Sequence, residues 1–230
     1  MQDDLAEPIR DHIAAALEPY GLVRRGGFAF KEANLRSPLI RGLHFRSVVL
    51  VGHFGSSIWP HFTRWWQDHP DAQDPLDQWS KDVLTAVAAR FGATAVFPSD
   101  RPYLPFQQWA MYAEGLRASP LGILIHPKYG LWHAFRGALL FGRVLELPGD
   151  IPQHHPCDDC QDKPCLSACP VNAFSDGGYD VVRCRAHLAS GDGEACLNGG
   201  CLARRACPVG REYTYSAPQM RFHMDAFAKS

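Results

Sequence analysis

Eight cysteines gathered near the C-terminal end are the feature that most constrains what this sequence can fold into. The chain has 230 residues, and none of the first 156 is a cysteine. A chain of this length can build a hydrophobic core without disulfide support, so the cysteines predict metal binding. They lie at Cys157, Cys160, Cys165, Cys169, Cys184, Cys196, Cys201 and Cys207.

The spacing of these cysteines favours two iron–sulfur clusters. The first four form C-x2-C-x4-C-x3-C-P, which has one longer gap than the C-x2-C-x2-C-x3-C-P run of two-cluster bacterial ferredoxins. In that run the fourth cysteine binds the other cluster. The same crossed pattern here gives a first set of Cys157, Cys160, Cys165 and Cys207, and a second set of Cys169, Cys184, Cys196 and Cys201.

Two structural zinc sites, or a disulfide scaffold, are the alternatives to clusters. Zinc held by four cysteines also uses C-x2-C pairs. The prolines that follow Cys169 and Cys207, together with the spacing of the first run, favour iron. Two [4Fe-4S] clusters in one small ferredoxin-like module indicate electron transfer and require an external electron donor.

Charge and hydropathy exclude several other classes of function. The 23 Lys and Arg residues nearly balance the 24 Asp and Glu residues, and no basic run stands out, which argues against a general nucleic-acid or anionic-membrane binder. The chain begins Met1-Gln2-Asp3-Asp4, without an apolar leader, and no apolar stretch is long enough to span a bilayer. We therefore expect a cytoplasmic protein without membrane partners.

The first 150 residues carry mixed helix and strand patterns. Hydrophobic periodicity predicts helices over 5–17, 75–91 and 106–116, and strands over 47–51, 93–97, 122–126 and 139–147. Gly21 ends the first helix, and Asp74 caps the second. We expect an α/β or α+β domain over 1–150, a linker at 147–152, and a metal-binding domain over 151–230 whose C-terminal tail packs back on the core.

One segment of the first 150 residues resembles a known family. Residues 125–137, IHPKYGLWHAFRG, are similar to the IHPRFGGWFAIRG segment of the cobalamin-processing protein CblC. Residues 18–22 and 74–78 are also similar to the corresponding CblC segments, so the resemblance runs in patches through residues 5–148. CblC has no ferredoxin module, so residues 151–230 depart from it.

The cysteine-rich part instead resembles epoxyqueuosine reductase, in which two [4Fe-4S] clusters feed a cobalamin-binding domain. Arg183-Cys184 matches an Arg-Cys pair of that family, and Asp100-Arg101-Pro102 lies where the family has an Asp followed by Pro, with a gap one residue shorter. The chain lacks the C-terminal helical repeats that the family associates with tRNA binding. A nucleic-acid substrate is therefore not expected.

Both resemblances imply a nitroreductase-like α+β fold with a central antiparallel sheet that binds cobalamin with its lower base displaced. Displacing that base exposes the cobalt to electrons and yields cob(I)alamin, a strong nucleophile and reductant. A flavin is a further candidate because such folds often hold one, although no residue selects it and the fold alone does not establish it.

Two residues are candidate proton donors in catalysis. Asp100 can act as a general acid if an apolar pocket keeps it protonated, and its alternative role is a helix N-cap. The phenol of Tyr103 is the second candidate, because a resemblance to reductive dehalogenases implies that a tyrosine can donate the proton.

Four residues of the CblC-like segment are candidate cofactor-binding residues: His126, Gly130, Trp132 and Arg136. His126 either contacts the ligand or stabilises the turn at 127–130. Arg136 either binds a corrin amide, a phosphate or a thiol substrate, or pairs with a carboxylate in the core.

The sequence therefore predicts an iron–sulfur oxidoreductase that passes electrons to cobalamin. Either cobalamin is itself the substrate and loses cyanide or an alkyl group, or bound cobalamin reduces a small organic substrate. The CblC-like segment favours the first version. The alternative is an electron carrier or cobalamin-trafficking partner without catalysis of its own. The oligomeric state is left open.

Overall fold

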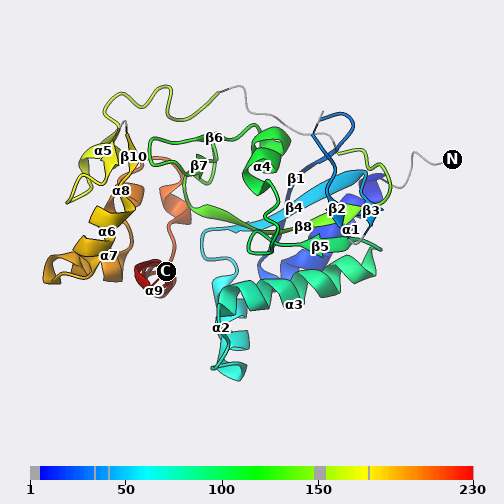
Figure 1. Ribbon diagram of the computed structural model, residues 1–230, viewed down its shortest axis with the longest axis horizontal. Coiled ribbons are helices and arrows are strands. Elements are labelled where there is room, and N and C mark those ends of the chain that lie inside the picture. The colour runs from blue at the N-terminus through cyan, green and yellow to red at the C-terminus, as the bar shows by residue number, and fades with distance from the viewer. Residues whose placement is uncertain (1–5, 34, 41, 148–153, 176, 230) are drawn as a thin grey trace. The chain divides into compact units, whose positions relative to one another are not determined.

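The computed structural model describes residues 6–33, 35–40, 42–147, 154–175 and 177–229 (Figure 1). The chain divides into two compact units. The sheet unit contains residues 1–53, 57–115 and 134–151, and the cysteine unit contains residues 54–56, 116–133 and 152–230.

A four-stranded sheet with the order β1-β4-β8-β5 forms the centre of the sheet unit. β1 pairs antiparallel with β4, and β5 pairs antiparallel with β8. Arg46 donates to the Phe141 carbonyl near one end of the β4–β8 pair, and Gly52 lies against Ala134 near the other, so β4 and β8 also run in opposite directions. The strands are β1 (Val23–Ala29), β4 (Ser47–Phe54), β5 (Thr94–Val96) and β8 (His133–Phe141).

Strand β4 is the most deeply buried element of the sheet. Residues 47–53 are all buried, which matches the run of apolar, β-branched side chains that predicts this strand. A strand covered on both faces has no solvent side to fill with polar residues. The prediction over 47–51 is confirmed, and the strand continues to Phe54.

Helices cover both faces of this sheet. Figure 1 shows α3 and α4 on opposite sides of it, and the β8 residue Arg136 binds Ser80 on α3. Helix α1 contacts both β1 and α3. The remaining elements of the unit are α1 (Ala6–Leu17), the 3-10 turn η2 (Glu18–Tyr20), α2 (Trp59–Asp68), α3 (Pro75–Arg90), α4 (Phe106–Glu114) and the hairpin β2 (Leu39–Ile40) and β3 (Leu43–His44).

The predicted helix ends are only partly correct. Gly21 adopts a left-handed φ of 66° directly after η2, as expected of a residue that ends a helix. Asp74 precedes α3, but its side chain makes no capping hydrogen bond. Its carbonyl instead accepts from the backbone N–H groups of Asp77 and Gln78. The position of the helix start was therefore predicted correctly and the capping interaction was not.

The strand predicted over 139–147 is wrong by six residues at its start, because β8 begins at His133 and ends at Phe141. Arg136 interrupts the apolar pattern, which hides the first half of the strand. The structure accommodates this charge by pairing the Arg136 guanidinium with Asp77, with 2.5 Å between Nη2 and Oδ1. The strand predicted over 122–126 is shorter, with β7 limited to Leu124–Ile125.

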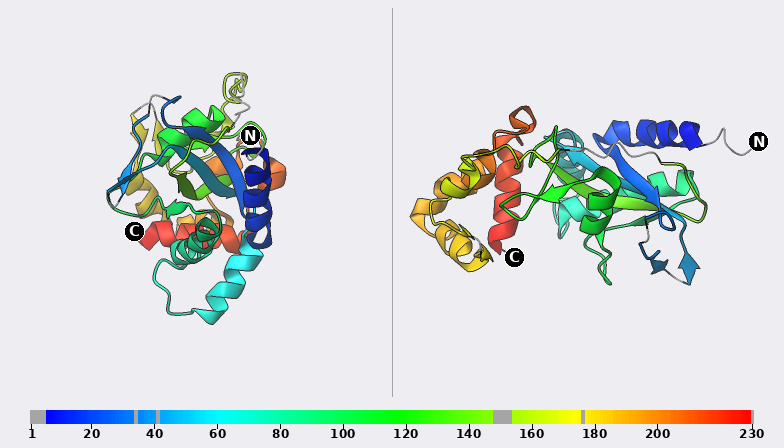
Figure 2. Two further views of the ribbon diagram at one scale, coloured as in Figure 1. Left: turned by 90° about the vertical axis from the view of Figure 1, so that its right-hand side faces the viewer. Right: turned by 90° about the horizontal axis from the view of Figure 1, so that it is seen from above.

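The cysteine unit consists of mostly short helices, turns and two small hairpins (Figure 2). Short helices suit a chain in which a cysteine must be presented every few residues. The elements are β6 (Arg117–Ala118), β7, α5 (Pro164–Ser167), β9 (Phe174–Ser175), β10 (Gly178–Tyr179), α6 (Val181–Leu188), η3 (Gly191–Gly193), α7 (Glu194–Gly199), α8 (Leu202–Arg205), η4 (Arg211–Tyr213) and α9 (Ala217–Lys229).

Neither unit is one continuous stretch of the sequence. The predicted boundary at 150 lies next to the last change of unit, but residues 54–56 and 116–133 group with the cysteine unit. Most of the predicted linker at 147–152 lies outside the described residues. The C-terminal tail forms α9, which packs against α7 of its own unit. Among the described residues, no helix is both long and apolar enough to cross a membrane.

A buried ion pair joins β1 to α4 in the sheet unit. Arg25 is 4% exposed, and its Nε donates to Glu114 Oε1 at 2.8 Å. The same carboxylate accepts from the backbone N–H of Gly26 at 2.8 Å. The Arg25 guanidinium also lies 4.5 Å from the centre of the Phe135 ring. Each charge is thus compensated by several contacts, which a buried ion pair requires.

We predict that Arg25→Met strongly destabilises the protein, because it leaves the Glu114 carboxylate buried without its partner. The expected loss is about 3–5 kcal/mol in the free energy of unfolding, measured by urea denaturation at neutral pH. The matched control is Lys81→Met, since Lys81 pairs with Asp100 while both side chains are more than 40% exposed. That variant should lose at most about 1 kcal/mol. Equal losses in both variants would contradict the prediction.

Candidate metal and cofactor site

The eight cysteines line two separate cavities of the cysteine unit, four in each. Cavity A contains Cys157, Cys160, Cys165 and Cys207. Cavity B contains Cys169, Cys184, Cys196 and Cys201. The structure therefore brings together the same two sets of four thiols that the crossed spacing pattern predicts. All eight are free, without a disulfide.

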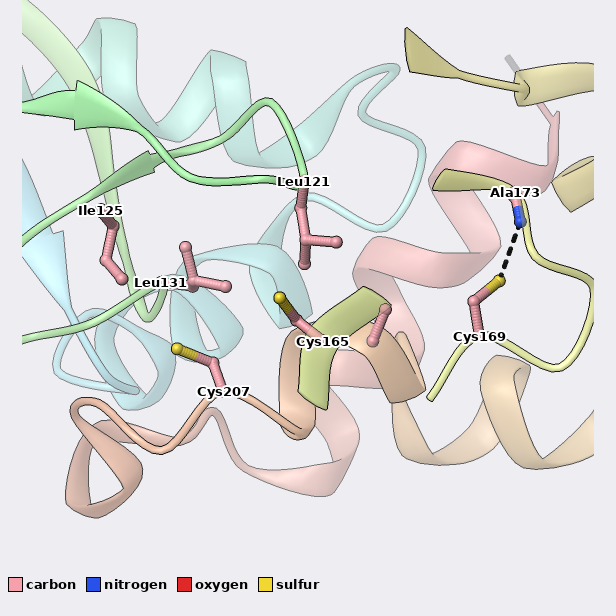
Figure 3. Packing of buried hydrophobic residues seen from close by; sticks show 8 residues of the cluster. Leu121, Ile125, Leu131, Cys165, Cys169, Ala173 and Cys207 are labelled. Carbon is pink, nitrogen blue, oxygen red and sulfur yellow. Dashed lines mark hydrogen bonds between the residues drawn. The ribbon is translucent and has the colours of Figure 1, made fainter. Parts of the chain in front are cut away.

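Cavity A is small and apolar. It measures about 20 Å³, and its wall is made of aliphatic side chains and prolines. Figure 3 shows the sulfurs of Cys165 and Cys207 on the side of Leu131, with Ile125 beside it. These residues form one buried cluster with Leu121. The lining residues besides the cysteines are Ser119, Pro120, Ile125, Leu131, Pro156, Lys163, Pro164, Pro208 and Val209.

A crossing of two backbones fixes cavity A to the turn at 127–130. Gly130 has a left-handed φ of 55°, and a Cβ there would overlap the carbonyl oxygen of Val209. Gly210 has a φ of 69°, and a Cβ there would overlap the backbone of Tyr129. Both glycines are needed for this approach, because only glycine combines a left-handed conformation with room for another backbone. The segment that follows Cys207 therefore lies directly on the turn.

Cavity B is larger and more polar. It measures about 280 Å³, which exceeds the space of a single water molecule many times over. Its wall includes Tyr179, His187, Arg204 and His223. The Tyr179 ring stacks on Phe174 with 4.6 Å between the centroids. Burial, and next the hydrogen bond with Cys184, raise the pKa of Tyr179.

Short elements position the thiols of cavity B. Cys184 lies on α6, which starts after Asp180, whose side chain caps the helix by accepting from the backbone N–H of Arg183. Cys196 lies on α7, and Cys201 immediately precedes α8. Cys169 accepts a hydrogen bond from the backbone N–H of Ala173 at 3.3 Å (Figure 3).

Burial favours the protonated form of five of the thiols. Desolvation, reinforced by the neighbouring thiols, raises the pKa of Cys157 to about 11. Burial also raises the pKa of Cys165, Cys196, Cys201 and Cys207. Metal binding must therefore displace protons, and the affinity for metal increases with pH. In the part of the chain that the structure describes, no three Cys, His, Asp or Glu side chains converge closely enough to hold a single metal ion.

The candidate proton donors Asp100 and Tyr103 lie in the sheet unit and are both open to solvent. The Asp100 carboxylate is 46% exposed and accepts from Lys81 Nζ at 2.7 Å. The expected apolar pocket is therefore not found around it. Asp100 is not a helix N-cap either, because α4 begins at Phe106. Tyr103 is 66% exposed and lies beside the Arg101 guanidinium.

The four candidate cofactor-binding residues all have structural partners. His126 Nδ1 accepts from the backbone N–H groups of Lys128 and Tyr129 at 3.0 and 3.2 Å, so this nitrogen stabilises the turn. Gly130 lies at the backbone crossing. Trp132 is 2% exposed, with the Arg204 guanidinium 4.6 Å from its ring. Arg136 belongs to the sheet unit and binds Ser80 as well as Asp77.

Comparisons with solved structures find the same two protein types that the sequence resembles. The sequence itself matches no protein-family model and no curated protein. The chain shares its fold with CblC and with epoxyqueuosine reductase. The B12-trafficking protein CblC of C. elegans matches with a TM-score of 0.56 and 17% identity, over 97% of this chain and 93% of that one. The match to CblC is thus not confined to residues 5–148.

Epoxyqueuosine reductases match over a smaller share of their own length. The enzyme of Bacillus subtilis matches with a TM-score of 0.56 and 12% identity, over 94% of this chain and 69% of that one. The enzyme of Streptococcus thermophilus matches with a TM-score of 0.53 and 14% identity, over 88% and 66%. The similarity is one of fold. It agrees with the mixed α/β architecture and with the nitroreductase-like fold predicted from the CblC-like segment.

Sequence reasoning did not single out the polar residues of cavity B. His187 follows Cys184 by three residues, and both line the cavity, so the helical spacing of this pair was an available signal. Arg204 lies between Cys201 and Cys207 and donates to the Leu131 carbonyl at 2.6 Å. Arg204 and Leu131 are 73 positions apart in the sequence, so no local sequence pattern predicts this contact.

We predict that Gly130→Ala disrupts the cysteine unit, because its Cβ would overlap the Val209 backbone. The matched control is Gly122→Ala, since Gly122 also has a left-handed φ, of 74°, but no atom within 4 Å of an added Cβ. The control should lose about 1–2 kcal/mol from backbone strain alone, measured by anaerobic chemical denaturation. The Gly130 variant should lose considerably more. Similar losses in both would show that the crossing is not tightly packed.

Proposed function

We propose that this protein is an iron–sulfur oxidoreductase that binds cobalamin with its lower base displaced and passes electrons to the cobalt from two [4Fe-4S] clusters. Cluster one is held in cavity A and cluster two in cavity B. The substrate is cobalamin itself, which undergoes reductive removal of cyanide or of an alkyl group. An external one-electron donor supplies the electrons.

The division of the eight thiols between two cavities is the observation that carries this proposal. Four thiols surround each cavity, and none is left over. Cysteines that served only as small apolar residues in the core would not be expected to form two groups of four, each around its own cavity. The same division supports a module of the two-cluster ferredoxin type, in which the ligand sets cross.

The donors of cavity B fit a polynuclear cluster better than a single zinc ion. A zinc ion is held by four sulfurs at about 2.3 Å from the metal, and a cavity of about 280 Å³ leaves much more room than that. Cavity A measures only about 20 Å³, so there the cluster assignment rests on the four thiols and not on the size of the space. His187 also lines cavity B, and its buried Nε2 has no hydrogen-bond partner among the described residues. The sulfides of a cluster would accept from this N–H group.

Each group of residues has a definite part in this function. The clusters supply one-electron transfer, and cobalamin supplies a cobalt centre that can be reduced when its lower ligand is removed. The aliphatic side chains and prolines of cavity A exclude water from cluster one. The crossing of Gly130 with Val209 holds that cluster next to the turn at 127–130, which lies in the segment most similar to CblC.

The exposure of Asp100 and Tyr103 favours removal of a cobalt ligand over reduction of an organic substrate. Removal of cyanide takes one electron, which converts Co(III) to Co(II), and cyanide leaves with the electron pair of the broken bond. No general acid has to donate a proton in this step. Reduction of an organic substrate would need a proton donor held in an apolar pocket, which Asp100 lacks.

The second candidate function is cobalamin trafficking or electron carriage without catalysis. The similarity to a solved structure described as a B12-trafficking protein, over nearly its whole length, favours this candidate. The eight free cysteines fit a reducing compartment, and we place either function in the cytoplasm. Neither function involves a membrane or a nucleic acid.

We predict that the purified, anaerobic protein binds about eight iron and eight sulfide ions, the content of two [4Fe-4S] clusters. Cys165→Ala and Cys196→Ala, one from each cavity, should each reduce the iron content to about half, because each removes a ligand of one cluster. Iron and acid-labile sulfide are measured chemically. Two zinc ions and no sulfide in the wild-type protein would overturn the cluster proposal.

We predict that cob(II)alamin added anaerobically to the protein shifts to the spectrum of the form without its lower base. The metal-free protein is the control, and it should bind without supporting turnover. With dithionite as electron source and cyanocobalamin as substrate, only the iron-loaded protein should release cyanide catalytically. Binding without cyanide release would favour the trafficking function, and an unchanged spectrum would remove cobalamin from both.

A further inference from the structure

The two cavities differ in the hydrogen-bond donors that they present, and this difference has a consequence for electron transfer. We propose that Tyr179 and His187 donate hydrogen bonds to cluster two and its thiolates and so give cluster two the higher reduction potential of the pair. The inference rests on the proposed binding of two clusters, and it names positioning residues that act on the cluster through these hydrogen bonds.

Tyr179 brings its hydroxyl group to a ligand of cluster two. The residue ends the short strand β10, lines cavity B, and makes a side-chain hydrogen bond with Cys184. Its ring stacks on Phe174 and lies near Phe227, with centroid distances of 4.6 and 6.2 Å. These ring contacts restrict the side chain, and from this position the hydroxyl can donate to the Cys184 thiolate.

His187 supplies the second donor from the same wall. It lies one helical turn after Cys184 on α6, so both side chains are on the same face of the helix. Its Nε2 is buried and has no hydrogen-bond partner in the described part of the chain, although the residue lines cavity B. A buried N–H group without a partner is costly. A cluster sulfide or thiolate in cavity B is the acceptor that would remove this cost.

Cavity A has fewer polar side chains at its wall. Apart from the cysteines its lining is apolar except for Ser119 and Lys163. Ser119 offers a single hydroxyl, whose oxygen accepts from the backbone N–H of Leu121. Lys163 is exposed, so water screens its charge.

Cavity B also has the stronger positive charge at its wall. Arg204 is half-buried, and its guanidinium lies 4.6 Å and 4.7 Å from the rings of Trp132 and Tyr215. Uptake of one electron adds one negative charge to a cluster. Hydrogen-bond donors and cations stabilise that charge and raise the potential. The first electron that enters the protein therefore reduces cluster two, and cluster one, beside the 127–130 turn, becomes the stronger reductant.

The test is a potentiometric titration of the iron-loaded protein, followed by electron paramagnetic resonance. Cys165→Ala and Cys196→Ala assign the two signals, since each variant loses one cluster. The Cys196-dependent signal should show the higher potential. Tyr179→Phe keeps the ring and removes the hydroxyl, and His187→Leu removes the imidazole. Each should weaken reduction of cluster two about tenfold, the scale of one hydrogen bond to a charged group, or about 59 mV for one electron.

Three further variants separate this effect from structural damage. His187→Gln keeps an N–H donor at a similar reach and should recover most of the loss seen in His187→Leu. Tyr213 and His154 belong to the same unit but line neither cavity. The control variants Tyr213→Phe and His154→Leu should therefore leave the reduction potentials of both clusters unchanged.

The outcomes distinguish this inference from the function on which it rests. If the wild-type protein contains two clusters but the Cys196-dependent signal has the lower potential, the inference is wrong and the cluster proposal stands. The same holds if neither Tyr179→Phe nor His187→Leu shifts a potential. If the wild-type protein contains fewer than two clusters, both fall together.

Discussion

The crossing of two backbones at Gly130 and Gly210 is the contact on which the arrangement of the cysteine unit depends. Each glycine has a left-handed backbone conformation. At each one, the backbone of the other segment occupies the space that a side chain would need. The crossing joins the turn at 127–130 to the residues that follow the last cysteine, Cys207. Without it, Cys207 could not reach the three other thiols of cavity A, which all come from a single loop and the short helix α5.

The crossed assignment of ligands that we propose would make the cysteine unit cooperative. Cys207 completes a set that begins 50 positions earlier, and Cys169 completes a set whose other members follow it. Neither half of the unit therefore contains a complete ligand set. Burial raises the pKa of five of the thiols, so the metal binding that we propose would release protons and be coupled to folding. This contribution would matter for the unit, since most of its helices are short and its hairpins have two residues per strand.

Local patterns in the sequence predicted most elements of the sheet unit. They failed where a charged residue in a strand pairs with a residue that is distant in the sequence. Strand β4 has a purely apolar run, so periodicity found it. The start of β8 was missed because Arg136 interrupts the pattern, and its partner Asp77 lies 59 positions away. The spacing of the cysteines predicted how they divide between two cavities. It could not predict Tyr179 or His187, since their role depends on the space enclosed by the cavity.

The contrast between the cavities explains how one small unit could both accept electrons and deliver them. A polar cavity stabilises the added charge and so retains an electron. In the function that we propose, an apolar cavity destabilises the same charge and makes its cluster a stronger reductant, as the reduction of cobalt requires. The apolar cavity is the one next to the turn most similar to CblC, and Leu131 contributes to its wall while its carbonyl accepts from Arg204 at the wall of the polar one. Leu131 thus links the two cavities, and the proposed order of the two clusters follows from the contrast between the cavity walls.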